Sequence, residues 1–401
     1  VFRVTGLPAS QSDEELTFSL KATIDENLER EEKSKLTPSI AIIPFCSNND
    51  EKVALVEFHG GAPSFLSALA DNPLGGWQVE MGDTDISFDQ HFFGFTQLYK
   101  SEPESSVTAD FIAIMGLDGH AYGSWRGKGN LGRMWLRDFL CKDLPKCRTM
   151  IYGYNSKLSS HGIDTIMDHG RGLMEELKKV RDTDELRKRP LFFVVHGFGG
   201  IILAHCLVKA VQTQEEDHPM MKSLYKATYG MLLFGIPHKG LVIDDIVKML
   251  AEQENHPRNA LLEQIRFKSN LLAFQLADFK NLIRDRKVVS FFETSQTRRL
   301  ELKRWKRTGD FITAVDTESS LLQLPDYTED KIPVDADHSM IVKFDTRNHP
   351  AYASARSKLL DFERDAPGVV SRRSTSTDAS LTVLGISAAN MPLDRHTNFP
   401  Q

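Results

Sequence analysis

The stretch PLFFVVHGFGGIILAHCLVKA, residues 190–210, decides the fold. An apolar run leads into the glycine-rich turn HGFGG, and the turn leads into a second apolar run. Continuous apolar runs of this kind are typical of a strand buried on both faces and of a covering helix. Histidines and glycines interrupt the apolar character, so the pattern favours a buried strand–turn–helix unit over a membrane span.

Similar apolar runs recur between residues 110 and 365. They are DFIAIMG, RTMIYGY, LFFVVHG, YGMLLFGIP, KVVSFFET and DKIPVDA. Three helical patterns lie among them: TIMDHGRGLMEELKKV, GGIILAHCLVKAVQ and LLEQIRFKSNLLAFQLADF. Buried strands that alternate with helices predict an α/β domain with a doubly wound, mostly parallel sheet.

Three further segments flank this domain. Residues 1–99 read β-α-β-β-α-β, with Ser12 and Glu15 as a capping box at the first helix, which predicts a small α+β ferredoxin-like domain. Residues 100–109 are expected to be a linker. Residues 366–401 are rich in Ser, Thr, Asn and Pro and are expected to be a disordered linker or tail.

The composition is that of an ordinary globular protein. Of 401 residues, 41% are hydrophobic and 26% are charged, and the net charge is −6. No basic excess points to nucleic acid or acidic lipid. Four scattered cysteines without a C-x-x-C pair argue against a disulfide framework or a zinc site. We expect a cytoplasmic protein, with peripheral membrane association as the alternative, and neither a metal nor another cofactor.

The turn HGFGG has the surroundings of the nucleophile elbow of serine hydrolases, G-x-S-x-G or H-S-x-G-G. Gly197 stands where that motif has its serine. The elbow holds its nucleophile at positive φ, a strain of roughly 1–3 kcal/mol that glycine removes. Because glycine also lacks the hydroxyl that forms an acyl intermediate, the substitution predicts loss of catalysis.

Six ordered blocks carry a resemblance to a known family. They are DFIAIMGLDGHAYGSWRGKG, MWLRDFLCKDLPKCRTMIYGYNSKL, FFVVHGFGGIILAHCLVKA, YGMLLFGIPHKG, VVSFFETSQT and DADHSMIVKF. Together they resemble the lipase-like α/β-hydrolases of the serine-active-site-containing family, in particular fungal members at the N-terminus of larger NTPase-repeat proteins. The resemblance covers residues 110–344, and the first domain resembles a degenerate RNA-recognition-like module.

The resemblance implies a set of site residues. In the chain order nucleophile, acid, histidine, the position of the nucleophile falls on Gly197 and the histidine on His338 in DADHS. The acid falls on Glu293, while Asp316 and Glu318 remain alternatives. His238 in GIPHKG is expected to be a structural, hydrogen-bonded histidine.

The oxyanion loop of this family corresponds to MGLDGH, residues 115–120, where relatives read HGLGGH. The backbone N–H groups of Leu117 and Phe198 would be the oxyanion donors. Met115 replaces a histidine and Asp118 replaces a glycine, and an ionised Asp118 pointing inward would oppose a developing oxyanion.

The RNA-recognition-like module lacks its base-stacking platform. Arg3 stands where the first strand would carry an aromatic, and Val53 and Leu55 stand at the stacking positions of the third strand. Glu51 and Lys52 replace the basic residue and glycine that open that motif. Nucleic acid is therefore not an expected partner.

The leading hypothesis is a catalytically impaired hydrolase domain that senses a lipid or ester ligand or contacts protein partners or further domains of a larger fungal protein. A working serine-type lipase or esterase is the first alternative, and an RNA-binding module is the second. A His338–Glu293 pair that activates water would leave slow hydrolysis. A single engineered change of serine to Gly197 is disfavoured, because Met115 and Asp118 depart from the pattern as well.

Overall fold

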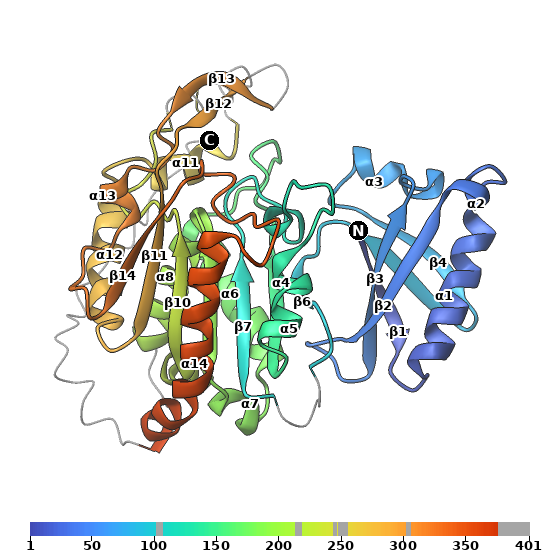
Figure 1. Ribbon diagram of the computed structural model, residues 1–401, viewed down its shortest axis with the longest axis horizontal. Helices are drawn as coiled ribbons and strands as arrows, with labels where there is room; N and C mark the ends of the chain where they lie inside the picture. Colours follow the sequence, from blue (N-terminus) through green and yellow to red (C-terminus); the bar gives the residue numbers. More distant parts are fainter. Residues whose placement is uncertain (102–106, 213–218, 244–246, 248–255, 302–305, 376–401) are drawn as a thin grey trace, which may run out of the picture.

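The computed structural model describes residues 1–101, 107–212, 219–243, 247, 256–301 and 306–375. Two sheets stand beside each other, one formed by the first 89 residues and the other by strands from residue 94 onward (Figure 1). A two-stranded ribbon of β12 (Thr297–Glu301) and β13 (Lys306–Ile312) rises above the second sheet.

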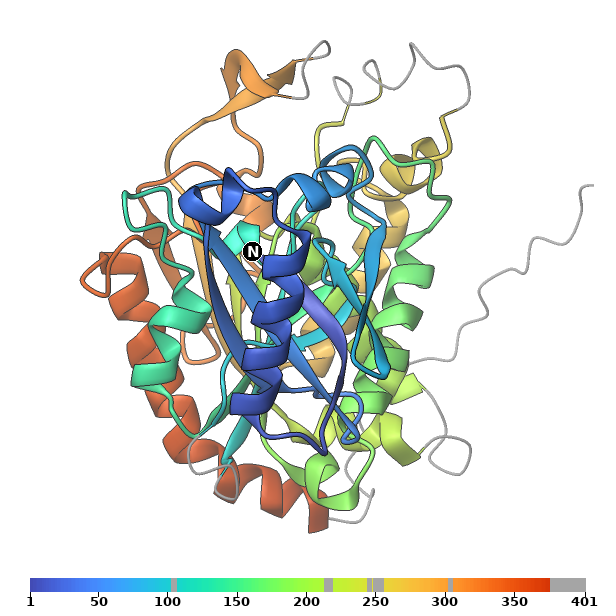
Figure 2. The ribbon, with the colours of Figure 1, turned by 90° about the vertical axis from the view of Figure 1, so that its right-hand side faces the viewer.

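The N-terminal sheet is antiparallel, with the order β2-β3-β1-β5-β4. Its strands are β1 (Phe2–Pro8), β2 (Thr37–Pro44), β3 (Glu51–His59), β4 (Gly76–Met81) and β5 (Thr84–Asp89). Helix α1 (Asp13–Asn27) covers one face of it (Figure 2). The capping box is confirmed, because Ser12 and Glu15 each accept a hydrogen bond from the other's backbone N–H.

The last strand of the ferredoxin-like order is one that the sequence did not predict. The segment WQVEM forms β4 at the edge, and β5 pairs with β1 in the place expected for the last strand. The expected second helix is reduced to a 3-10 turn (Ser64–Leu66) and α3 (Ala68–Asp71), while α2 (Glu32–Lys35) precedes β2. Side chains of β1 and β3 that face α1 form their own apolar core.

The second sheet has seven strands in the order β14-β11-β10-β9-β7-β8-β6. They are β6 (Gly94–Gln97), β7 (Ala109–Ile114), β8 (Cys147–Gly153), β9 (Leu191–His196), β10 (Thr228–Phe234), β11 (Lys287–Glu293) and β14 (Glu329–Val334). Every pair is parallel except β6 with β8. All six apolar runs therefore form strands of one mostly parallel sheet, and this order, with a strand–turn–helix elbow after β9, is the α/β-hydrolase fold.

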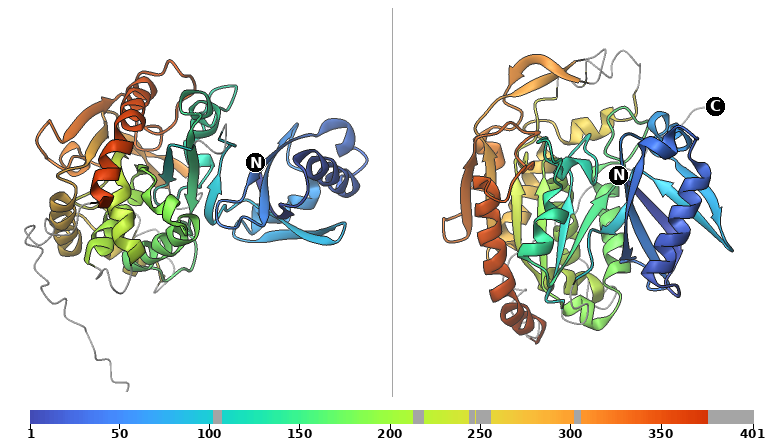
Figure 3. Two further views of the ribbon diagram at one scale, coloured as in Figure 1. Left: turned by 90° about the horizontal axis from the view of Figure 1, so that it is seen from below. Right: turned by 45° about the vertical axis from the view of Figure 1, so that its right-hand side comes forward.

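Helices cover both faces of this sheet (Figures 1 and 3). Helix α14 (Pro350–Thr375) crosses one face, and α6 (Ile166–Val180) and α8 (Phe198–Gln212) lie behind the other. The remaining helices are a 3-10 turn (Gly123–Trp125), α4 (Trp135–Asp138), α5 (Leu140–Asp143), α7 (Asp184–Lys188), α9 (Pro219–Ala227), α11 (Asn259–Gln264), α12 (Asn270–Leu282) and α13 (Thr317–Ser320). No helix among the described residues is both long and apolar enough to cross a membrane.

Two expectations about helices need correction. The pattern LLEQIRFKSNLLAFQLADF forms α11 and α12 rather than one helix. The helix is interrupted between them because the carbonyl of Ile265 accepts a hydrogen bond from Leu241 N–H and Lys268 adopts φ +64°. The tail expected from residue 366 begins later, because buried Ala366 and Val370 extend the packed face of α14 to residue 375. Residues 376–401 of that tail lie outside the described residues.

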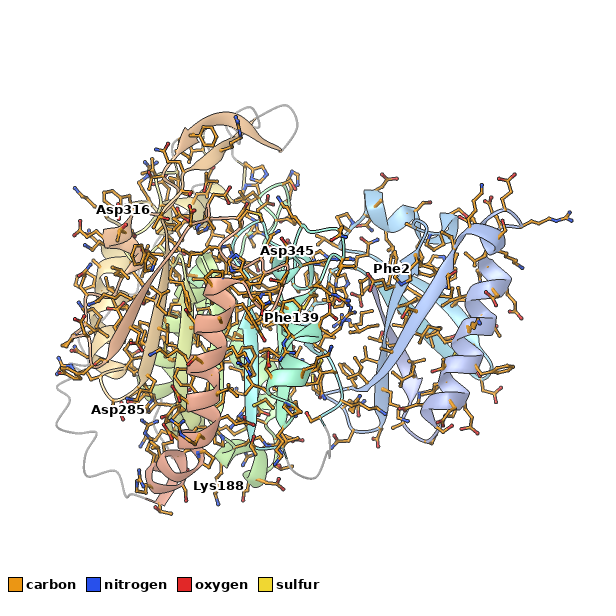
Figure 4. The ribbon with its side chains drawn as sticks, viewed as in Figure 1. Phe2, Phe139, Lys188, Asp285, Asp316 and Asp345 are labelled. Atoms are coloured by element: carbon orange, nitrogen blue, oxygen red, sulfur yellow. The ribbon has the colours of Figure 1, made fainter. Side chains whose placement is uncertain are left out.

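A continuous apolar core fills both sides of the second sheet and reaches the first sheet. Figure 4 places Phe139 beside this sheet and Phe2 within the N-terminal one. Ile43 and Leu55, from β2 and β3, belong to the larger core and not to the core beneath α1. The N-terminal sheet therefore packs one face on α1 and the other on the second unit.

Candidate functional site

The elbow lies at the carboxyl edge of the second sheet, where β9 ends and α8 begins. Gly197 is the single residue between them and has φ +50°. Its N–H donates to the carbonyl of Phe234 on the neighbouring strand at 3.0 Å, and its carbonyl accepts from Gly200 N–H at 3.1 Å. Position 197 therefore has the left-handed conformation that a nucleophile elbow requires.

The histidine and one carboxylate meet beside the elbow. Nδ1 of His338 lies 2.9 Å from Oε2 of Glu293. Glu293 ends β11, and its other carboxylate oxygen accepts the N–H of Val315 at 2.9 Å. The Glu293 side chain is only 2% exposed, whereas that of His338 is 15% exposed. Because the buried carboxylate of Glu293 holds Nδ1 of His338, Nε2 of the same ring points away from Glu293.

The free side of His338 faces the elbow. A Cβ atom built on Gly197 would lie 3.1 Å from Nε2 of His338. A Cβ atom built on Gly235, which follows β10 with φ +54°, would lie 3.1 Å from Nδ1. The histidine ring is therefore held closely between two backbone turns that carry no side chain.

The two alternative acids have other partners. Asp316 caps α13, accepting the N–H of Ser319 at 2.6 Å, and lies on the outer side of the sheet (Figure 4). The Glu318 side chain is 76% exposed and forms an ion pair with Lys239. Of the three candidate carboxylates, Glu293 is the one that hydrogen-bonds to His338.

A second histidine supports the first and was not singled out from the sequence. Nε2 of His196 lies 2.9 Å from the carbonyl oxygen of His338, and the two rings are 4.7 Å apart. The N–H of His338 donates to Oγ1 of buried Thr297 at 3.0 Å. The only sequence signal for His196 is its place directly before Gly197.

The expected oxyanion loop follows β7. Among the described residues, the backbone N–H groups of Leu117 and Phe198 donate no hydrogen bond. Asp118 has φ +55°, and its own N–H is taken by the carbonyl of Ser156 at 2.8 Å. The Asp118 carboxylate is 3.9 Å from Nζ of Lys157 and one third exposed. One N–H donor, that of Leu117, thus lies in the loop directly before Asp118, and the other, that of Phe198, lies at the start of α8.

Met115 and His238 are both buried. Met115 is 2% exposed and joins the main core, while its carbonyl accepts the hydroxyl of Tyr154 at 2.9 Å. Burial lowers the pKa of His238 to about 3. The expected hydrogen bond of this ring is not found at Nε2, which has no partner among the described residues. Within the same residues, no group of three or more His, Cys, Asp or Glu side chains gathers to hold a metal ion.

Comparison with known proteins gives distant relatives. No protein-family model matches the chain. It is 27% identical over 288 residues to Protein SERAC1 of Danio rerio and 27% identical over 293 residues to that of Bos taurus. Each match covers 65% of this chain but only 40% and 39% of those relatives. The chain therefore matches about two fifths of the length of the curated relatives.

Two solved structures are similar at low identity. One is the lipase BlEst2 of Bacillus licheniformis in mature form, with TM-score 0.42, 14% identity, and coverage of 65% of this chain and 97% of that one. The other is phospholipase PlaB of Legionella pneumophila, with TM-score 0.43, 13% identity, and coverage of 67% and 62%. Because both scores are below 0.5, we base the fold on the strand order and the elbow. On those grounds the chain has an α/β-hydrolase fold, and over 65% of its length it is similar to SERAC1 proteins.

Proposed function

We propose that the chain contains a catalytically impaired hydrolase domain of lipase or esterase type, which binds a lipid or ester group without efficient turnover. One observation carries the proposal. The elbow position that faces Nε2 of His338 is Gly197, and a Cβ atom there would be only 3.1 Å from that nitrogen. A hydroxyl at this position would lie beside a general base, but Gly197 carries no hydroxyl.

The proposed roles follow from the geometry. His338 would be the base and Glu293 would orient it, as the 2.9 Å bond at Nδ1 allows. Gly197 would mark the lost nucleophile. The unused N–H groups of Leu117 and Phe198 would hold a carbonyl oxygen of the ligand. These parts suffice to bind an ester carbonyl, whereas acyl transfer also needs the missing oxygen.

A second candidate function is slow hydrolysis by water. The hydrogen bond between His338 and Glu293 favours it, because an oriented histidine can take a proton from a water molecule near Gly197. This water would attack the ester carbonyl directly, and the proton would pass through His338 to the leaving alcohol. No covalent enzyme intermediate would form.

We do not propose RNA binding. The sheet face that would stack bases carries Arg3, Val53 and Leu55, which are 5%, 2% and 2% exposed. Arg3 forms an ion pair with Asp89, and Leu55 belongs to the core shared with the second unit. We infer instead that the domain serves a larger fungal, cytoplasmic protein, through a lipid or ester ligand and through contacts with partners or further domains.

Two measurements test the proposal. The unmodified chain should not be labelled by a fluorophosphonate probe, because Gly197 offers no hydroxyl. It should hydrolyse short-chain aryl esters no faster than a His338→Ala variant. Turnover that depends on His338 without labelling would support the water mechanism, whereas labelling together with turnover would establish a serine enzyme and overturn the proposal.

A further inference from the structure

The turn between the two sheets contains a backbone outlier. Phe92 adopts φ +54° although it is an aromatic residue, and it is fully buried. Large side chains rarely adopt this conformation, and it persists where surrounding contacts over-determine it. Such residues gather at functional sites, which makes the contacts of Phe92 informative.

A buried ion pair fixes the turn. The N–H of Phe92 donates to Oδ1 of Asp89 at 2.8 Å, and Nε of Arg3 donates to Oδ2 of the same carboxylate at 2.8 Å. Nη1 of Arg3 also donates to the Phe93 carbonyl at 2.8 Å and to Oγ1 of Thr96 at 2.9 Å. The first strand of the N-terminal sheet therefore holds the backbone that leads into the second sheet.

The ring of Phe92 packs on the end of the expected oxyanion loop. Its centroid lies 5.8 Å from that of His120 and 5.7 Å from that of Tyr122. Nδ1 of His120 in turn accepts the N–H groups of Tyr122 at 3.1 Å and Gly123 at 2.9 Å. Phe92 belongs to the core of the second unit, so it joins a turn of one unit to a loop of the other.

The N-terminal sheet contacts the continuation of the same loop. Oε1 of Glu57, on β3, accepts a hydrogen bond from Nη2 of Arg126 at 2.9 Å, and Oε2 lies 3.6 Å from Nη2 of Arg137. Glu57 shares its sheet face with Leu55, because side chains alternate along a strand. The N-terminal unit therefore contacts the segment from His120 to Arg137 twice, through the ring of Phe92 in the turn after β5 and through the carboxylate of Glu57 on β3.

We propose that the N-terminal unit is an intramolecular clamp that positions residues 116–126, with Phe92 as the positioning residue. The clamp rests on the proposed function in so far as Leu117 of this loop would bind the ligand's carbonyl oxygen. The face that an RNA-recognition-like module would offer to bases is occupied by this contact. Loosening the clamp should mobilise the loop before it affects the rest of the sheet.

Backbone amide hydrogen exchange in the full chain tests the clamp. Phe92→Gly removes the ring while allowing positive φ, so the chain can keep its path. We expect exchange of residues 116–126 to rise about tenfold, with strand β10 unchanged as the internal reference. Phe92→Leu, which keeps some apolar contact, should give a smaller rise in the same segment.

Phe88→Leu is the matched control. Phe88 is fully buried in the same unit, but it packs in the core beneath α1, against Phe65 and Trp77. Unchanged exchange in residues 116–126 of both Phe92 variants, or an equal rise in Phe88→Leu, would overturn the clamp. Because this readout needs no catalysis or ligand, it stands apart from a failure of the proposed hydrolase function.

Discussion

The two halves of the candidate site differ in how closely they match a catalytic triad. On one side, His338 and Glu293 keep a 2.9 Å hydrogen bond and a buried carboxylate. On the other side, the elbow position is Gly197, and the expected oxyanion loop carries Met115 and Asp118 where the family pattern HGLGGH has a histidine and a glycine. The difference teaches that the acid–base geometry of a triad can be present where the elbow offers no side-chain oxygen to react.

The hydrogen bonds of Glu293 and His338 also stabilise the fold. Glu293 binds Val315 N–H, and His338 contacts Thr297 and His196 through its backbone. Replacing one partner would leave a buried carboxylate or N–H group without its hydrogen bond, which costs about 1–3 kcal/mol. Persistence of the pair therefore does not require catalysis.

At the elbow, a reactive side chain would instead favour reaction at a cost to folding. A serine at position 197 must adopt φ near +50° and crowd Nε2 of His338 at 3.1 Å. That arrangement is unfavourable for folding and is useful only for reaction. Glycine at position 197 avoids this strain, whereas removal of Glu293 would leave His338 and the N–H of Val315 without their hydrogen-bond partner.

The largest expected effect comes from Gly197→Ser. The new hydroxyl would lie beside Nε2 of His338, so we expect fluorophosphonate labelling to rise by about 10⁴-fold or more over the unmodified chain. The double variant Gly197→Ser, His338→Ala is the control and should not react. Equal labelling of both variants would mean that the two halves of the site no longer work together.

Glu293→Gln in the Gly197→Ser background should have the next largest effect. The amide keeps the shape but cannot stabilise a charged imidazole or fix its tautomer, so labelling should fall by about 10³-fold. Asp316→Asn, at the alternative acid that caps α13, is the matched control and should leave the rate unchanged. A larger loss in the Asp316 variant would transfer the role of the acid to that residue.

Asp118→Asn in the same background isolates the charge in the oxyanion loop. Asparagine tolerates the φ of +55° and retains the backbone N–H that donates to the Ser156 carbonyl, while removing the negative charge of the residue that follows Leu117. We expect about a tenfold faster reaction, measured as the rate of ester hydrolysis. No change would show that Lys157, 3.9 Å away, already neutralises Asp118.

Local patterns predicted the parts of the fold that local sequence controls. Six apolar runs identified the parallel strands of the second sheet, and Ser12 with Glu15 identified the start of α1. The family resemblance assigned Gly197, Glu293 and His338 to the nucleophile, acid and histidine positions, and the structure brings the three together.

The features that local sequence patterns did not predict depend on contacts between residues far apart in the chain. Arg3 read as a missing stacking aromatic, whereas in the structure it binds Asp89, 86 residues away, and faces the second unit. Strand β5 and the extension of α14 depend on partners far along the chain, namely β1 and the apolar core. No window around residue 92 indicates that Phe92 contacts His120.

The smallest expected effect measures the strain at the elbow itself. Gly197→Ala adds only a Cβ atom, which would sit at positive φ and 3.1 Å from Nε2 of His338. We expect the free energy of unfolding to fall by about 1–2 kcal/mol, because both the backbone strain and the close contact are introduced without any new hydrogen bond. Gly82→Ala is the matched control, since Gly82 also has positive φ but a Cβ atom there meets nothing within 4 Å. The difference between the two variants in urea unfolding reports the contact with His338 alone. Equal losses would mean that backbone strain accounts for the whole effect and that His338 yields without cost. Crowding against His338 would then not contribute to the preference for glycine at position 197.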